Sequence, residues 1–171
     1  MAMQSIVLVV YNVRSAHNVG SILRTADGLG IEKIYFSGYT PYPGSDSDTR
    51  LPHLAAKIDH QIHKTALGAE KSVNWRSEPD IKKLLKKLDA QKYQLVALEQ
   101  TDKAVDIKKF TPADKIAVIV GSEVGGLPSA VLDKCEAHIN IPMAGQKESF
   151  NVAVAAAIAL YHLKYIQGLP G

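Results

Sequence analysis

The chain has 171 residues, of which 46% are hydrophobic and 22% are charged, with a net charge of +3. This size and balance predict a single globular domain over residues 1–171. The single Cys135 excludes an internal disulfide framework, and the longest apolar stretch, residues 152–160, is too short to span a bilayer. No signal peptide is recognisable, so a cytoplasmic protein is expected. The mild positive charge permits a polyanionic partner without requiring one.

The first third of the chain predicts a strand, a helix and a second strand. Residues 6–11 form a continuous apolar, β-branched run, which is typical of a strand buried on both faces. Residues 18–29 carry apolar side chains at helical spacing, and Gly28 and Gly30 are expected to end that helix. Residues 33–37 are a second apolar run. This βαβ order indicates a parallel sheet.

The middle of the chain is less regular. Residues 38–59 are rich in Pro, Ser and Asp and predict a long loop, which in a compact domain is functional or disordered. A short helix is expected at 64–71 and a short strand at 73–75. Residues 80–90 form an amphipathic helix, with Ser77 and Pro79 as its start signal. The polar face of this helix carries four lysines. Two interpretations of these lysines remain possible, a solvated surface and a stripe that binds phosphates.

The last part of the chain alternates strands and helices. Strands are predicted at 94–98, 116–120 and 137–141, and helices at 128–134 and 149–166. Ser149 is expected to cap the last helix, which is apolar almost all round and therefore packs against more than one neighbour, such as a second subunit. The fold class is thus α/β, with a mostly parallel sheet flanked by helices. Ligands in such folds bind beyond the carboxyl ends of the strands.

Three of these strand ends run into loops, two of them rich in small residues. Val120 is followed by Gly121, Ile141 by a Pro-Met-Ala-Gly segment, and Leu98 by Glu-Gln-Thr. Glycines let the backbone approach a ligand closely, so such a slot suits a flat adenine ring. The glycine fingerprints of dinucleotide-binding and P-loop proteins are absent, and no His or Cys cluster has zinc spacing, so no metal is expected.

Taken singly, the polar residues near these loops have ordinary interpretations. Asn18 and Ser149 could cap helices, Arg24 and Asn151 could face water, and Glu123 could pair with a lysine. Cys135 is interpreted as a structural thiol.

Three segments in order nevertheless resemble the motifs of the SpoU/TrmH family of RNA methyltransferases, in the SPOUT class. They are Asn18-Val-Gly-Ser-Ile-Leu-Arg-Thr25, Gly121-Ser-Glu-Val-Gly-Gly-Leu127, and an Ile-Pro-Met segment leading to Ser149-Phe-Asn-Val-Ala-Val-Ala155. Phe150 and Ala153 depart from the Leu and Ser of the family pattern. The resemblance runs from about residue 5 to residue 165.

The resemblance implies a C-terminal trefoil knot, a homodimer, and transfer of a methyl group from S-adenosylmethionine to a ribose 2′-hydroxyl of tRNA or rRNA. The cofactor-binding residues it implies are Leu98, Glu99, Gly121, Ile141, Met143, Ser149 and Phe150. The catalytic residues it implies are Arg24, Asn18, Glu123, Ser149 and Asn151. In this scheme Arg24 binds a phosphate or the developing alkoxide, since a guanidinium stays protonated. The two asparagines orient Arg24 and the ribose, Glu123 holds the site together, and Ser149 fixes the backbone.

RNA contacts are expected from Arg14, Arg50, Lys64 and the loop of residues 38–60, with His17 as a further candidate. Such a small core either recognises a local stem-loop alone or needs an accessory protein. Two other functions stay open at this point. One is an RNA-binding homologue without catalysis, and the other is a small-molecule α/β enzyme. The sequence names neither the RNA nor the nucleotide.

Overall fold

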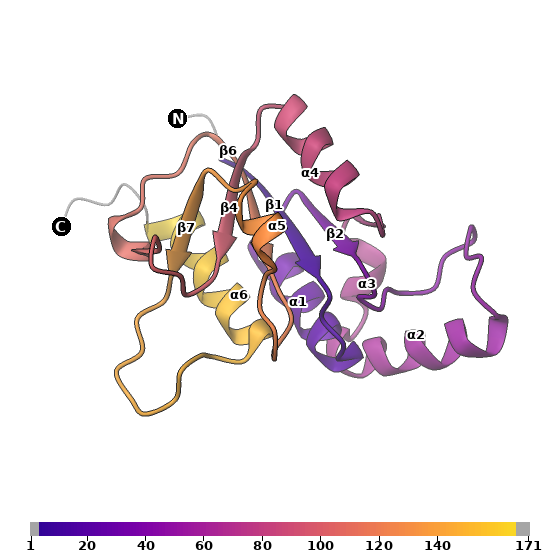
Figure 1. Ribbon diagram of the computed structural model, residues 1–171. Coiled ribbons are helices and arrows are strands. Elements are labelled where there is room, and N and C mark those ends of the chain that lie inside the picture. The colour runs from indigo at the N-terminus through magenta and orange to yellow at the C-terminus, as the bar shows by residue number, and fades with distance from the viewer. Residues whose placement is uncertain (1–3, 167–171) are drawn as a thin grey trace.

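The computed structural model describes residues 4–166 and contains a seven-stranded sheet in which each strand pair is parallel (Figure 1). The strand order is β3-β2-β1-β6-β4-β7-β5. The strands are β1 (Ser5–Tyr11), β2 (Lys33–Ser37), β3 (Trp75–Ser77), β4 (Gln94–Leu98), β5 (Val105–Asp106), β6 (Lys115–Val120) and β7 (Ala137–Asn140). The helices are α1 (Ala16–Leu29), α2 (Pro52–Ala66), α3 (Ala69–Ser72), α4 (Ile81–Ala90), α5 (Ser129–Leu132) and α6 (Val152–Tyr161). A 3-10 helix, η1 (Ile107–Lys109), and a π-helix, η2 (His162–Ile166), complete the list.

The sheet is covered on both faces, which confirms the predicted α/β class. Successive side chains of β1 point to opposite faces, as in any strand. Leu8 and Val10 pack in the cluster that contains α1 and α6, whereas Val7 and Val9 pack in the cluster that contains α4 and α5. The apolar strands that the sequence predicts are therefore buried on both sides. The knot that the resemblance implies stays a prediction.

Helix α1 begins two residues earlier than predicted. Its N-cap is Ser15, whose hydroxyl accepts a hydrogen bond from the Asn18 N–H at 3.2 Å. Gly30 ends the helix with a left-handed φ of 58°, and Gly28 lies inside the helix. The cap interpretation of Asn18 is thus wrong, because Ser15 already satisfies this end of the helix. The Asn18 side chain is free to make other contacts.

The predicted loop at 38–59 is wrong in its second half, where α2 begins at Pro52. Proline is well suited to a first helical position, so the residue that suggested a loop marks a helix start. Only Ile62 and Ala66, near the end of α2, are buried, and Leu54 near its start is exposed. Figure 1 accordingly shows α2 extending away from the sheet. The helix predicted at 64–71 divides into the end of α2 and the short α3.

Several smaller predictions also need correction. The N-cap of α4 is Asp80, whose carboxylate accepts the Lys83 N–H at 3.1 Å, and not Ser77 or Pro79. The N-cap of α6 is Asn151 and not Ser149. Strand β3 lies two residues beyond the predicted 73–75, and β5 and η1 were not predicted. Between residues 4 and 166, no helix is long and apolar enough to cross a bilayer.

Candidate functional site

A cavity of about 520 Å³ opens at the carboxyl ends of β4, β6 and β7. Since these strands are parallel neighbours, the three loops that follow them meet at one edge of the sheet. The cavity contains six of the seven predicted cofactor-binding residues: Leu98, Glu99, Gly121, Ile141, Ser149 and Phe150. Met143, the seventh, is not among the lining residues. Val120, Ser122, Asn140 and Glu148 also line the cavity without being predicted ligands, although each is next to a predicted ligand in the chain.

The loop after β6 folds back tightly on itself. Gly121 is buried, and a Cβ atom there would lie 2.6 Å from the carbonyl carbon and oxygen of Gly126. Gly126 has a left-handed φ of 61°, and its N–H donates to the Ser122 carbonyl at 3.0 Å. Both glycines are therefore required by the backbone itself, which gives the cavity a wall of main-chain atoms.

Glu99 holds this loop against the end of β4. Its Oε2 accepts the Leu127 N–H at 2.9 Å, and its Oε1 accepts the Gln100 N–H at 3.1 Å. A Cβ atom on Gly126 would lie 2.3 Å from the same Oε2. Both oxygens of Glu99 accept hydrogen bonds from backbone amides, so the carboxylate positions the loop that forms the cavity wall. Glu99 also lines the cavity, and its contact with the cofactor stays a prediction.

Residues from all three motifs meet beside the cavity. The Asn18 Nδ2 donates to Glu123 Oε1 at 2.8 Å, and the Asn151 Nδ2 donates to Asn18 Oδ1 at 3.2 Å. Asn151 also caps α6 through its Oδ1, which accepts the Ala153 N–H at 2.9 Å. Ser149 is exposed on the cavity wall. This chain of hydrogen bonds connects α1, the loop after β6 and the start of α6.

Arg24 lies apart from this cluster. It is exposed on α1, six residues after Asn18, and is not among the residues that line the cavity. An α-helix turns by roughly 100° per residue, so the two side chains leave α1 in directions about 120° apart. Within residues 4–166 the guanidinium has no hydrogen-bond or ion-pair partner. It is therefore available to an external anion.

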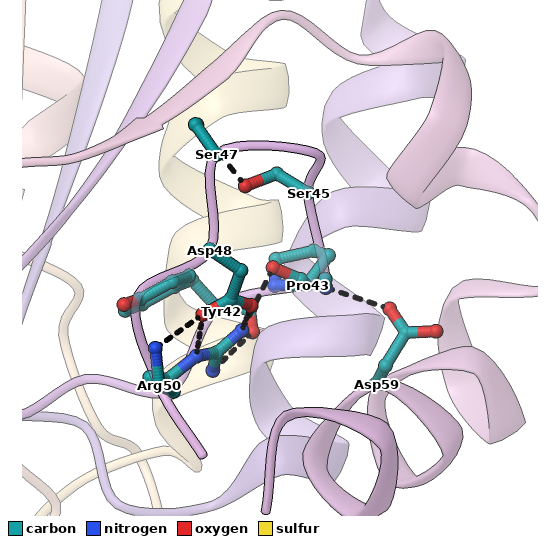
Figure 2. Close-up of polar contacts among 8 residues, drawn as sticks. Tyr42, Pro43, Ser45, Ser47, Asp48, Arg50 and Asp59 are labelled. Atoms are coloured by element: carbon teal, nitrogen blue, oxygen red, sulfur yellow. Dashed lines mark hydrogen bonds and ion pairs between the residues drawn. The ribbon is translucent and has the colours of Figure 1, made fainter. Parts of the chain in front are cut away.

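The expectation that Arg50 contacts RNA is not supported, because its guanidinium is engaged inside its own loop (Figure 2). It bonds the Asp48 carboxylate and the carbonyl oxygens of Tyr42 and Pro43, and its carbon lies 3.8 Å from the centre of the Tyr42 ring. The hydrogen bond from Arg50 lowers the pKa of Asp48 to about 2 and, in return, raises the pKa of Arg50. The Gly44 N–H donates to Asp59 of α2 at 2.8 Å. Arg50 thus stabilises the loop.

Cys135 has the properties of a structural thiol, as expected. Burial raises its pKa to about 12, and the neighbouring Glu136 acts in the same direction. The thiol donates to the Val131 carbonyl at 3.4 Å. A thiol with this pKa is protonated at neutral pH and is a poor nucleophile.

Comparison with known proteins agrees with this geometry. Residues 5–161 match the sequence model of the SpoU rRNA Methylase family. A protein of Staphylococcus haemolyticus that carries the TrmH family name is 28% identical over 159 residues, which cover 93% of this chain and 58% of that protein. The chain therefore spans little more than half the length of this relative.

Two crystal structures have the same fold. One, described as an RNA 2′-O ribose methyltransferase, has a TM-score of 0.77 and 26% identity over 94% of this chain and 56% of its own. The other, an AdoMet-bound rRNA methyltransferase from Sinorhizobium meliloti, has a TM-score of 0.79 and 22% identity over 97% of this chain and 58% of its own. Because the family model matches nearly the whole chain, this protein belongs to the SpoU rRNA Methylase family.

Proposed function

We propose that this protein transfers a methyl group from S-adenosylmethionine to a ribose 2′-hydroxyl of tRNA or rRNA in the cytoplasm. The observation that carries the proposal is the hydrogen-bonded contact of Asn18, Glu123 and Asn151 at the edge of the cavity. It joins three motif segments that are far apart in sequence beside one pocket at the strand ends. Membership of the family and the names of its relatives support the reaction class.

The cavity suits the cofactor in size and chemistry, because its volume of about 520 Å³ is in the range of small-molecule sites. Leu98, Ile141 and Phe150 offer apolar surface to an adenine ring, while the folded loop of Gly121 offers backbone groups for hydrogen bonds. Glu148 adds a carboxylate that would attract a positively charged sulfonium. When bound, S-adenosylmethionine supplies an electrophilic methyl group.

The residues of this chain would then position the ribose. An in-line reaction requires the hydroxyl oxygen to be held against the methyl group, and such positioning contributes strongly to rate. The Asn18–Glu123–Asn151 cluster provides amide groups in fixed orientations for this purpose. A guanidinium group acts as a cation in proteins, so Arg24 would bind an RNA phosphate or the developing alkoxide and would not act as a base.

A homodimer would reconcile the position of Arg24 with this role. Val154, Ile158, Tyr161 and Tyr165 follow helical spacing along α6 and η2 and are between 37% and 53% exposed in the single chain. A contiguous apolar stripe of this kind is typical of an interface. Because the Arg24 of the same chain does not line the cavity, we infer that a second subunit packed on this stripe supplies its own Arg24 to the cavity of the first.

The first test is methyl transfer from labelled S-adenosylmethionine to total cellular RNA, with Arg24→Ala and Arg24→Lys as variants. We expect label in one RNA size class, at a linkage that resists alkali, because a methylated 2′-oxygen cannot attack the neighbouring phosphate. Arg24→Ala should lose the label while it retains cofactor binding in calorimetry. Full activity of Arg24→Ala would contradict the role of the charge. Failure of the wild type to bind the cofactor would favour a non-catalytic RNA-binding protein.

A mixing experiment tests the shared site. Arg24→Ala and Gly121→Ala should each be inactive alone. If each cavity uses the arginine of the other subunit, mixed dimers regain one intact site, and a statistical mixture recovers about a quarter of wild-type activity. If each subunit works alone, the mixture stays inactive.

A further inference from the structure

An exposed aromatic ring lies beside a free arginine at the carboxyl ends of β1 and β2. Tyr39 is 56% exposed, which is high for a tyrosine, and the Arg14 guanidinium carbon lies 5.9 Å from the centre of its ring. Arg14 is exposed, and within residues 4–166 it has no carboxylate partner. Neither residue belongs to the three motifs. An open ring next to a guanidinium is the combination that proteins use to stack unpaired bases.

The backbone beneath the Tyr39 ring is fixed by an unusual turn. The Tyr39 N–H donates to Asn12 Oδ1 at 3.1 Å, and the Asn12 N–H donates to the Ser37 carbonyl at 3.2 Å. Asn12 has φ of 57° and Gly38 has φ of 64°, and a Cβ atom on Gly38 would lie 1.8 Å from Asn12 Oδ1. A non-glycine residue in this conformation persists where its surroundings determine it, and such residues concentrate at ligand-binding positions.

A buried hydroxyl connects the two backbone segments that carry Tyr39 and Arg14. Thr40 is 3% exposed, and its Oγ1 accepts the Val13 N–H at 3.2 Å. The same hydroxyl lies 2.9 Å from the Val10 carbonyl and 2.8 Å from the Ser37 carbonyl, to which it donates. These bonds join the segment after β2 to the connection between β1 and α1, which carries Arg14. Tyr39 and Arg14 therefore extend from backbone segments that are hydrogen-bonded to each other through Thr40.

The loop that follows is also ordered without using Arg14. Figure 2 shows the Arg50 side chain folded against Tyr42, and the Tyr42 ring in turn packs on Trp75 at 6.2 Å. The Arg50 guanidinium thus makes its contacts inside the protein. Of the two arginines expected to contact RNA in this region, Arg14 is the one with a free guanidinium.

Tyr39 and Arg14 lie where a nucleotide next to the reacting one would be expected. Strand β2 lies two strands from β6, so its end is roughly 10 Å from the cavity wall that follows β6. Arg14 also precedes Asn18, which lies in the first turn of α1, by four residues. We propose that Tyr39 and Arg14 form a stacking platform for an unpaired RNA base next to the ribose that is methylated. This inference rests on the proposed function for its substrate, since the platform recognises RNA.

The test distinguishes the contribution of the RNA bases to binding affinity from that of the sugar-phosphate backbone. The probes are a dodecamer of oligoadenylate and a fully abasic ribose-phosphate dodecamer, whose affinities for the full chain are measured by fluorescence anisotropy at one salt concentration. Wild type should prefer oligoadenylate. Tyr39→Ala should weaken oligoadenylate binding by about 5- to 150-fold, the range for loss of one base–aromatic stack, and leave the abasic probe unchanged. Tyr39→Phe keeps the ring and should keep the affinity, whereas Arg14→Ala should weaken both probes.

Val105→Ala, an exposed apolar residue on β5 at the far edge of the sheet, is the matched control and should change neither affinity. Equal loss of both probes in Tyr39→Ala, or no loss of either, would overturn the platform. A change from dimer to monomer in that variant would also overturn it, since the ring would then belong to a subunit interface. Methyl transfer is measured in a separate assay. If the protein lacked transferase activity but still preferred oligoadenylate in a way that depends on Tyr39, the proposed reaction would be refuted. Base stacking on Tyr39 would still be supported.

Discussion

Gly20 of the first motif is predicted to be a packing residue, and Gly20→Ala tests this directly. A Cβ atom at Gly20 would lie 2.3 Å from the Ile62 carbonyl oxygen, 2.9 Å from the Ala66 nitrogen and 2.1 Å from Thr65 Oγ1. The Thr65 side chain could rotate, but the other two atoms belong to the backbone of α2. Carbon and oxygen rarely approach closer than about 3.3 Å, so α2 would have to move by roughly 1 Å.

Overpacking of this kind costs about 1–3 kcal/mol, and the better helix propensity of alanine offsets about 0.5–1 kcal/mol of it. We therefore expect Gly20→Ala to lower the free energy of unfolding by roughly 1–2 kcal/mol and Tm by about 2–8 °C. Urea denaturation with an unchanged slope would confirm a loss of folded-state stability. Gly28→Ala is the control on the same helix, because a Cβ atom there has no neighbour within 4 Å, and it should be neutral or stabilising. Equal stability of the two variants would refute the packing argument.

Three further outcomes follow from individual contacts. Glu99→Ala leaves the Leu127 N–H without its acceptor, so cofactor affinity in calorimetry should fall by about 5- to 150-fold, with a smaller loss in Glu99→Gln. Unchanged affinity would contradict the role of Glu99 in positioning this loop. Because Arg50 depresses the pKa of Asp48 from 3.8 to about 2, the loop contact is complete above about pH 4 and is lost as the pH falls towards 2. Relative to its rate on an unstructured peptide at the same pH, pepsin should therefore cut residues 42–50 faster at pH 2 than at pH 4, and Asp48→Asn should abolish this normalised difference. Cys135, with a pKa of about 12 against an ordinary 9.0, should react with iodoacetamide at pH 8 at least a hundredfold more slowly than in urea; similar rates would show that the thiol is accessible and ionised.

The parts of the fold that the sequence predicts well are those with a strong local signal. Strand β4 begins and ends where predicted, and β1 and β6 differ from the prediction by one residue, because their apolar, β-branched runs have no competing interpretation. Helix α2 was missed for a physical reason. No residue of its first half is fully buried, and Leu54, Ile58, Ile62 and Ala66 recur every four residues without a denser apolar stripe.

The sequence predicts many of the residues that line the candidate site, and it does not predict the contacts between them. Asn18 and Asn151 are separated by 133 positions, and nothing in either segment specifies that their amides bond each other. That contact depends on how α6 returns to α1. The direction of a side chain in an irregular segment is equally invisible from sequence. Ile141 lines the cavity and Met143, two residues later, does not. Glu99 was found by its position, but its bonds to backbone amides depend on the fold of the next loop.

The first motif places three different tasks on one helix, and this affects how its variants must be interpreted. Asn18 contacts Glu123, Gly20 contacts the backbone of α2, and Arg24 is exposed. Gly20 and Arg24 follow Asn18 by two and six residues, so the rotation of the helix directs the three residues to different surroundings. If part of the shift between the two helices falls on α1, Gly20→Ala would move Asn18 and Arg24 together. A slower reaction in that variant is thus no sign that Gly20 touches the cofactor. A lower kcat with an unchanged KM for S-adenosylmethionine would indicate that the effect is transmitted through α1. A raised KM with an unchanged kcat would place Gly20 at the cavity and would contradict its position against α2.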